Sequence, residues 1–124
     1  MGKKKKINKS NEKTVKSVNN GIRSSVRKLN PILRSIVGKK VDVAIRDLQF
    51  SEKRITRDVR KTISSAVANA ENNNKLDIDT LEVKSIMVNQ GMRLKRMRPR
   101  ARGRADRIIK PTCHIEIILS DQEK

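Results

Sequence analysis

The sequence has 124 residues and contains no tryptophan, no tyrosine, one phenylalanine and one cysteine. With so few aromatic residues, the hydrophobic core must be small and aliphatic. A single cysteine excludes a framework of internal disulfide bonds. No run of about 18 apolar residues occurs, so no membrane-spanning helix is expected. The first residues lack the apolar segment of a secretory signal peptide. These absences predict one small cytosolic domain.

Acidic residues are scarce relative to basic ones, 13 against 31, which gives a formal net charge of +18. Self-repulsion at this level opposes a compact free monomer and favours binding to nucleic acid. The charge is +9 over residues 1–28, +3 over 29–91, +8 over 92–110 and −2 over 111–124. The sequence therefore predicts a nearly neutral body with two cationic arms. Residues 1–14 form a lysine-rich tail that we expect to be disordered until bound, and residues 122–124 form a second short tail.

The segment Met92–Lys110 carries most of the second arm and is rich in arginine. It contains seven arginines, two lysines and one aspartate, whereas the rest of the chain has 15 lysines and 7 arginines. The planar fork of arginine binds phosphate through two hydrogen bonds and stacks on bases, while lysine acts as a point charge. Pro99 and Gly103 suit a turn at the centre of the segment. The pattern indicates an extended element bound to structured RNA, with a disordered basic tail as the alternative.

Three helices are expected between the arms. The first runs from a cap at Ser24-Ser25 to Val37, with apolar residues at helical spacing. Pro31 is unfavourable inside it, so either this helix is kinked or Asn30 caps a shorter helix that begins at Pro31. The second helix is expected over Val41–Phe50. The third is expected to be capped by Ser51 and to end near Asn72.

Strands are expected on both sides of the helices. Val15–Ile22 has the pattern of an edge strand, and Leu81–Asn89 and Cys113–Ser120 are rich in valine and isoleucine. The connection between the last two strands is far longer than a usual hairpin loop, so both strands are expected to continue outward as a two-stranded ribbon. An isolated ribbon is marginal in water and would be held by RNA. The predicted fold class is α+β, with three helices packed on a small antiparallel sheet and a long protruding β-hairpin at residues 87–109, all within one domain at residues 15–121.

No pattern typical of catalysis or metal binding is present. Cys113 and His114 are neighbours on a predicted strand and point to opposite faces, and zinc needs three or four ligands. The carboxylates Asp77, Asp79 and Glu82 lack the spacing of a calcium loop. A glycine-rich phosphate loop and a catalytic triad are absent. We therefore expect no enzyme activity, no metal and no cofactor.

The run Arg96–Ile108, together with His114–Ile117 and the AVANAEN stretch at Ala66–Asn72, resembles the family of large-subunit ribosomal protein twenty-two, in a bacterial or organellar form. Two features depart from the family pattern, namely Pro31 in the first helix and the extra lysines Lys3–Lys6. The resemblance implies a body on the outer surface of the large subunit. It also implies a hairpin that passes through ribosomal RNA and ends at the wall of the peptide exit tunnel.

The resemblance and the charge pattern together give three sets of candidate residues. The ribbon residues expected to bind ribosomal RNA are Arg93, Lys95, Arg96, Arg98, Arg100, Arg102, Arg104, Arg107 and Lys110. The tip expected to line the tunnel is Arg98, Pro99, Arg100, Ala101, Arg102 and Gly103. The body residues expected to bind ribosomal RNA are Arg23, Arg27, Lys28, Lys39 and Lys40.

The expected function is a structural constituent of the ribosome in the cytoplasm. Its expected partners are large-subunit ribosomal RNA, neighbouring ribosomal proteins and the nascent peptide, while no DNA and no membrane partner is expected. The alternative is a free-standing nucleic-acid-binding protein or RNA chaperone, which would bind duplex DNA about as well as ribosomal RNA.

Overall fold

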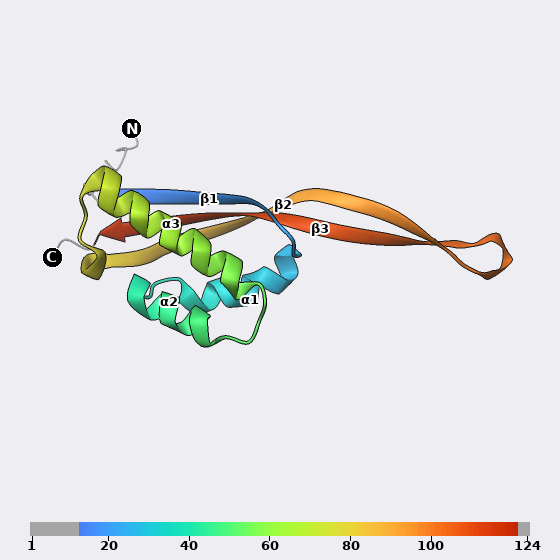
Figure 1. Cartoon of the computed structure of the whole chain (residues 1–124), viewed down its shortest axis with the longest axis horizontal. Helices are drawn as coiled ribbons and strands as arrows, with labels where there is room; N and C mark the ends of the chain where they lie inside the picture. Colours follow the sequence, from blue (N-terminus) through green and yellow to red (C-terminus); the bar gives the residue numbers. More distant parts are fainter. Residues whose placement is uncertain (1–12, 122–124) are drawn as a thin grey trace, which may run out of the picture.

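The computed structural model describes residues 13–121. The expected tail at 122–124 and residues 1–12 of the expected tail at 1–14 lie outside this range, whereas Thr14 belongs to the first strand. A small body carries a ribbon that extends well beyond it (Figure 1). The fold is α+β, as predicted. Its elements, in chain order, are β1 (Thr14–Ile22), α1 (Val26–Ile36), α2 (Val41–Phe50), α3 (Thr56–Asn74), the 3-10 turn η1 (Ile78–Thr80), β2 (Leu81–Pro99), the 3-10 turn η2 (Ala101–Gly103) and β3 (Ala105–Asp121).

The three strands form one antiparallel sheet in the order β1-β3-β2. β1 is therefore an edge strand, as predicted, and it begins at Thr14, one residue earlier than expected. The central strand β3 pairs with β1 over its second half and with β2 along its whole length. The pairing of β2 with β3 continues to Pro99↔Ala105, beyond the point where β1 ends. The ribbon is the part of β2 and β3 that has no third strand beside it.

The core lies between one face of the sheet and the helices, with α3 crossing the sheet and α1 and α2 below it (Figure 1). Alternate residues of β3 point into it, and all four are fully buried: Cys113, Ile115, Ile117 and Leu119. This is the period of two that a strand with one buried face requires. The core contains only aliphatic side chains and the cysteine, as the shortage of aromatic residues predicted.

Helix α1 runs through Pro31 without ending there, so the shorter helix capped by Asn30 is wrong. A proline inside a helix removes one backbone hydrogen bond and costs about 3 kcal/mol. Four buried side chains on α1, at Leu29, Ile32, Leu33 and Ile36, offset this cost; burial contributes roughly 1.5–3 kcal/mol for each. The Pro31 ring itself lies on the exposed side of the helix.

Helix α2 has the predicted bounds, but α3 begins four residues later than expected. Ser51 does not cap α3, because it is the C-cap of α2 and Ile55 holds the N-cap position of α3. The helix starts at Thr56, whose buried hydroxyl donates to the carbonyl of Lys53 at 2.6 Å. It ends two residues later than expected, at Asn74, because Lys75 takes a left-handed conformation and Leu76 bonds back to the Ala70 carbonyl. Burial of Leu76 completes this helix-ending motif.

Candidate nucleic-acid interface

The ribbon carries basic side chains on both of its faces. In an antiparallel pair, directly opposite residues project from the same face, and the next pair projects from the other. One face therefore holds Arg96 with Ile108 and Arg98 with Asp106, while the other holds Lys95 with Ile109 and Met97 with Arg107. Every residue from Lys95 to Lys110 is exposed. A ribbon that is basic and partly apolar on both faces suits an environment of RNA on both sides rather than one flat surface.

A compact turn closes the end of the ribbon. Arg100 donates its backbone N–H to the Arg104 carbonyl at 2.7 Å, and η2 lies between them. Arg102 and Gly103 have φ angles of 59° and 68°. These are left-handed conformations, which glycine adopts without cost. The turn predicted between Pro99 and Gly103 is therefore present, but Pro99 itself is still paired in β2, opposite Ala105.

The root of the ribbon is an irregular section of the sheet. The register of β2 and β3 shifts between Gln90 and Arg93, which marks a β-bulge. Thr112 donates its hydroxyl to the Met92 carbonyl at 2.6 Å there. The backbone N–H of Gly21, near the end of β1, donates to Nδ1 of His114 at 3.2 Å. These contacts connect the start of the ribbon to the end of the edge strand β1.

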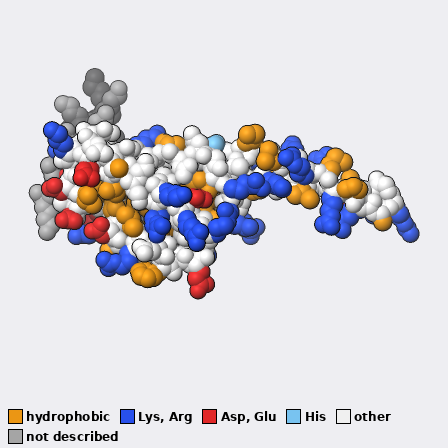
Figure 2. Space-filling view, in the orientation of Figure 1, with side chains coloured by type: hydrophobic (Ala, Val, Ile, Leu, Met, Phe, Trp, Pro, Cys, Tyr) orange, Lys and Arg blue, Asp and Glu red, His pale blue; other side chains and the backbone are white. Residues whose placement is uncertain are grey.

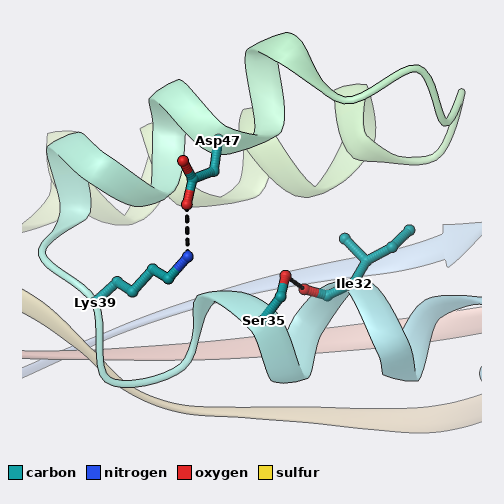
Figure 3. A network of polar contacts seen from close by, with 4 residues as sticks. All are labelled: Ile32, Ser35, Lys39 and Asp47. Carbon is teal, nitrogen blue, oxygen red and sulfur yellow. Dashed lines mark hydrogen bonds and ion pairs between the residues drawn. The ribbon is translucent and has the colours of Figure 1, made fainter.

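The body residues predicted to bind RNA do not form one patch. Arg23, Arg27 and Lys28 are exposed around the start of α1, whereas Lys39 and Lys40 follow its end. The eight helical residues from Leu29 to Ile36 lie between Lys28 and the second group and span about 12 Å. Lys39 is also occupied, because its ammonium lies 2.6 Å from the Asp47 carboxylate on α2 (Figure 3). The structure therefore places three of the five residues together at the start of α1, while Lys39 forms an ion pair elsewhere.

Arg54 joins the group at the start of α1, a contact that sequence reasoning missed. Its guanidinium donates to the backbone carbonyl of Arg23 at 3.1 Å, across 31 positions of sequence. In the sequence, Arg54 is one of four cations within residues 54–61, and nothing local distinguishes it from the others. Only the fold brings it beside Arg23. Figure 2 shows basic side chains along the ribbon and over the part of the body nearer to it, while most of the acidic ones lie at the opposite end, with others in the middle and at the lower edge of the body.

The structure bears out the expectations for the cysteine and histidine. Cys113 is fully buried, its Sγ lies 2.8 Å from the Ser24 carbonyl oxygen, and burial raises the pKa of its thiol. His114 projects from the other face of β3. Within residues 13–121 no group of three or more His, Cys, Asp or Glu side chains could hold a metal ion. None of the helices in this range combines the length and apolar character needed to cross a membrane.

Comparison with known proteins gives one consistent match. The model of the family described as ribosomal protein L22p/L17e matches residues 17–120. A relative named large ribosomal subunit protein uL22, from Pelagibacter ubique (strain HTCC1062), is 66% identical over the whole chain and 94% of its own length. A protein of the same name from Beijerinckia indica is 51% identical over 86% of this chain and 82% of its own length. The chain therefore belongs to the ribosomal protein L22p/L17e family, whose members are structural and not enzymes.

Proposed function

We propose that this protein is a structural constituent of the large ribosomal subunit that binds large-subunit ribosomal RNA through its ribbon. The observation that carries the proposal is the ribbon itself. It is exposed from Lys95 to Lys110, takes no part in the hydrophobic core, and contains one acidic residue among its cations. A two-stranded ribbon is marginal alone in water, so its length is best explained by a polyanion that surrounds it.

The second RNA contact in this proposal is the group at the start of α1, formed by Arg23, Arg27, Lys28 and Arg54. Binding would depend mainly on phosphate contacts and RNA shape, because the major groove of A-form RNA is too narrow for side chains to read. The acidic end of the body would then face away from RNA, toward solvent or neighbouring ribosomal proteins.

We further infer that the tip, Arg98–Gly103, lines the peptide exit tunnel and meets the nascent peptide. This inference rests on the family's known hairpin and on the tip sequence, which resembles it residue by residue. The closed turn at the tip supports it, since a compact, strongly basic end can set the local width and potential of a channel. The site of action would be ribosomes in the cytoplasm.

Two measurements test the proposal. After expression in a bacterial host, the protein should remain with large subunits that are sedimented through a high-salt cushion. The purified protein should also prefer a large-subunit RNA transcript over duplex DNA of equal length in a competition assay. Loss from subunits in the wash, together with equal binding to both polymers, would favour a free-standing nucleic-acid-binding protein or RNA chaperone instead.

A further inference from the structure

Phe50 is the one Phe, Trp or Tyr residue in the chain, and it lies on the surface at the end of α2. It is 79% exposed, the largest exposure of any large hydrophobic residue in the described range. The inner face of α2 fills its share of the core with Val41, Ala44 and Leu48. Core packing therefore does not account for Phe50, and neither does the ribbon, which lies at another part of the molecule.

Basic side chains lie around Phe50. Arg46 is exposed and precedes it by one helical turn, so both project from the same side of α2. Lys53 follows three residues later, and the contact of Arg54 with Arg23 joins this segment to the cationic group at the start of α1. Two acids are near: Asp47 is neutralised by Lys39 (Figure 3), and Glu52 is exposed. Within residues 46–54 the three cations Arg46, Lys53 and Arg54 thus outnumber the two acids, and Arg54 connects this segment to the start of α1.

A shallow depression of about 210 Å³ lies between α1 and α2, and Leu48 and Ser51, which flank Phe50 in the chain, both line it. Half of its lining is apolar, and the other half consists of Ser35, Asp47, Ser51 and Lys53. The Ser35 hydroxyl already donates to the Ile32 carbonyl at 2.6 Å (Figure 3), and Lys39 pairs with Asp47. Ser51 and Lys53 can donate hydrogen bonds to ribose and phosphate oxygens, and the apolar side chains can pack against a ribose or a base.

We propose that Phe50 is a stacking platform for an unpaired base of RNA, with Arg46 and Lys53 holding the neighbouring phosphates. The proposal rests on the proposed function and adds a body site to it. Unpaired RNA bases stack on exposed aromatic rings in many proteins, and this interaction tolerates any base because each has a π-face. The cations beside the ring supply phosphate contacts, which carry most of the affinity for RNA.

The absence of tryptophan from the chain allows a direct test. In F50W the new indole is the only strong fluorophore, and stacking on a base should quench its emission when a large-subunit RNA transcript is added. The matched control is I78W, which places tryptophan at the partly exposed Ile78 on the acidic end of the body. Emission from I78W should stay unchanged. Equal quenching of both variants, or none at position 50 while RNA is bound, would overturn the proposal.

Affinity measurements distinguish stacking on the aromatic ring of Phe50 from a general hydrophobic contribution to RNA binding. F50L should weaken binding to the transcript roughly tenfold, and F50Y should bind like the unmodified protein. Neither change should affect folding, because Phe50 is outside the core, and helical circular dichroism checks this. If F50L binds as tightly as the unmodified protein, the stacking site is wrong while the proposed function stands. If the unmodified protein itself does not bind the transcript, the proposed function fails.

Discussion

Arg100 and Asp106 form an ion pair across the end of the ribbon, with Nε of Arg100 donating to Oδ2 of Asp106 at 2.5 Å. Asp106 is the only acidic residue between Met92 and Lys110. It also stands opposite Arg98 in the strand register. One of the arginines of the tip is thereby held in a fixed direction, and Arg98 projects from the same face as Asp106. The acid orders the tip at the expense of one positive charge.

Replacing Asp106 by Asn should remove this ion pair with little effect on folding. Both side chains are more than half exposed, and exposed pairs contribute only about 0–1 kcal/mol. Binding to the RNA transcript should tighten by less than tenfold at low salt, because a negative charge near phosphate is removed. Filter binding and urea unfolding measure the two effects. A tenfold loss of affinity would instead show that Asp106 is needed to orient Arg100.

Replacing Arg96, Arg98 and Arg100 together by Ala should reduce the salt dependence of RNA binding. Each phosphate neutralised by the protein contributes roughly 0.7–0.9 to the slope of log affinity against log salt concentration. We expect the slope to flatten by about two, from binding curves at several salt concentrations. The control replaces Arg34, Lys61 and Lys75, which are exposed on the helical side of the body, and removes the same charge. An equal change in both variants would contradict the assignment of these arginines to phosphate.

Replacing Met92–Ile108 by a short glycine-containing turn should leave the body folded. No residue of this segment belongs to the hydrophobic core, so the buried area that stabilises the body is unchanged. Helical circular dichroism should be nearly intact, and thermal melting should stay cooperative. A broad, non-cooperative melt would show that the body and the ribbon do not have the boundary that we propose.

Gly91→Ala should destabilise the root of the ribbon. A Cβ at this position would lie 2.7 Å from the Thr112 hydroxyl oxygen and 3.1 Å from the His114 ring. The Thr112 hydroxyl cannot simply move away, because it is bonded to the Met92 carbonyl. Overpacking of this kind costs about 1–3 kcal/mol, which urea unfolding would detect. In the double variant Gly91→Ala/Thr112→Ala, the loss in free energy of unfolding should be smaller than the sum of the losses in the two single variants. If Gly91→Ala is as stable as the unmodified protein, the Thr112 and His114 side chains at the root of the ribbon can move to accommodate the added methyl group.

Deleting Leu94–Arg96 should move the tip. Three residues of strand span about 10 Å, and removing them from one strand alone also slips the register by an odd number, which reverses the faces of the paired residues. We expect ribosomes that contain this variant to assemble and to form peptide bonds, but to respond differently to macrolides or to stalling peptides. Ribosome profiles and stalling assays would measure this.

The control for the deletion also removes the register partners Ile108, Ile109 and Lys110. This variant shortens the ribbon by the same amount and keeps its pairing intact. If both variants alter the responses, the length of the ribbon determines them. If only the first variant alters them, the strand register determines them. Unaltered responses in both would contradict the tunnel-lining role of the tip.

Much of the molecule could be predicted from local sequence patterns. The isoleucine-rich stretch Cys113–Ser120 predicted a strand on which Cys113 and His114 point to opposite faces, and the second helix was expected over the bounds that α2 has. The apolar flanks of the arginine-rich segment predicted that it continues a strand pair. These features depend on the period of side chains along one element, which the sequence states directly.

Features that depend on contacts between distant segments could not be predicted in this way. The start of α3 at Thr56 depends on the loop after α2, which Arg54 holds through the Arg23 carbonyl. The persistence of α1 through Pro31 depends on how much of its apolar face is buried, a quantity that packing sets. In both places a local preference was outweighed by tertiary contacts.

Composition and charge do not change on folding, so a nearly neutral body with an aliphatic core and a cationic ribbon could be inferred from the residues alone. Which cations lie together depends on the tertiary structure. It placed Arg54 beside Arg23, engaged Lys39 with Asp47, and left Phe50 exposed next to Arg46. The reason is that electrostatic contacts act over a few ångströms, and only packing determines which distant residues come within that distance.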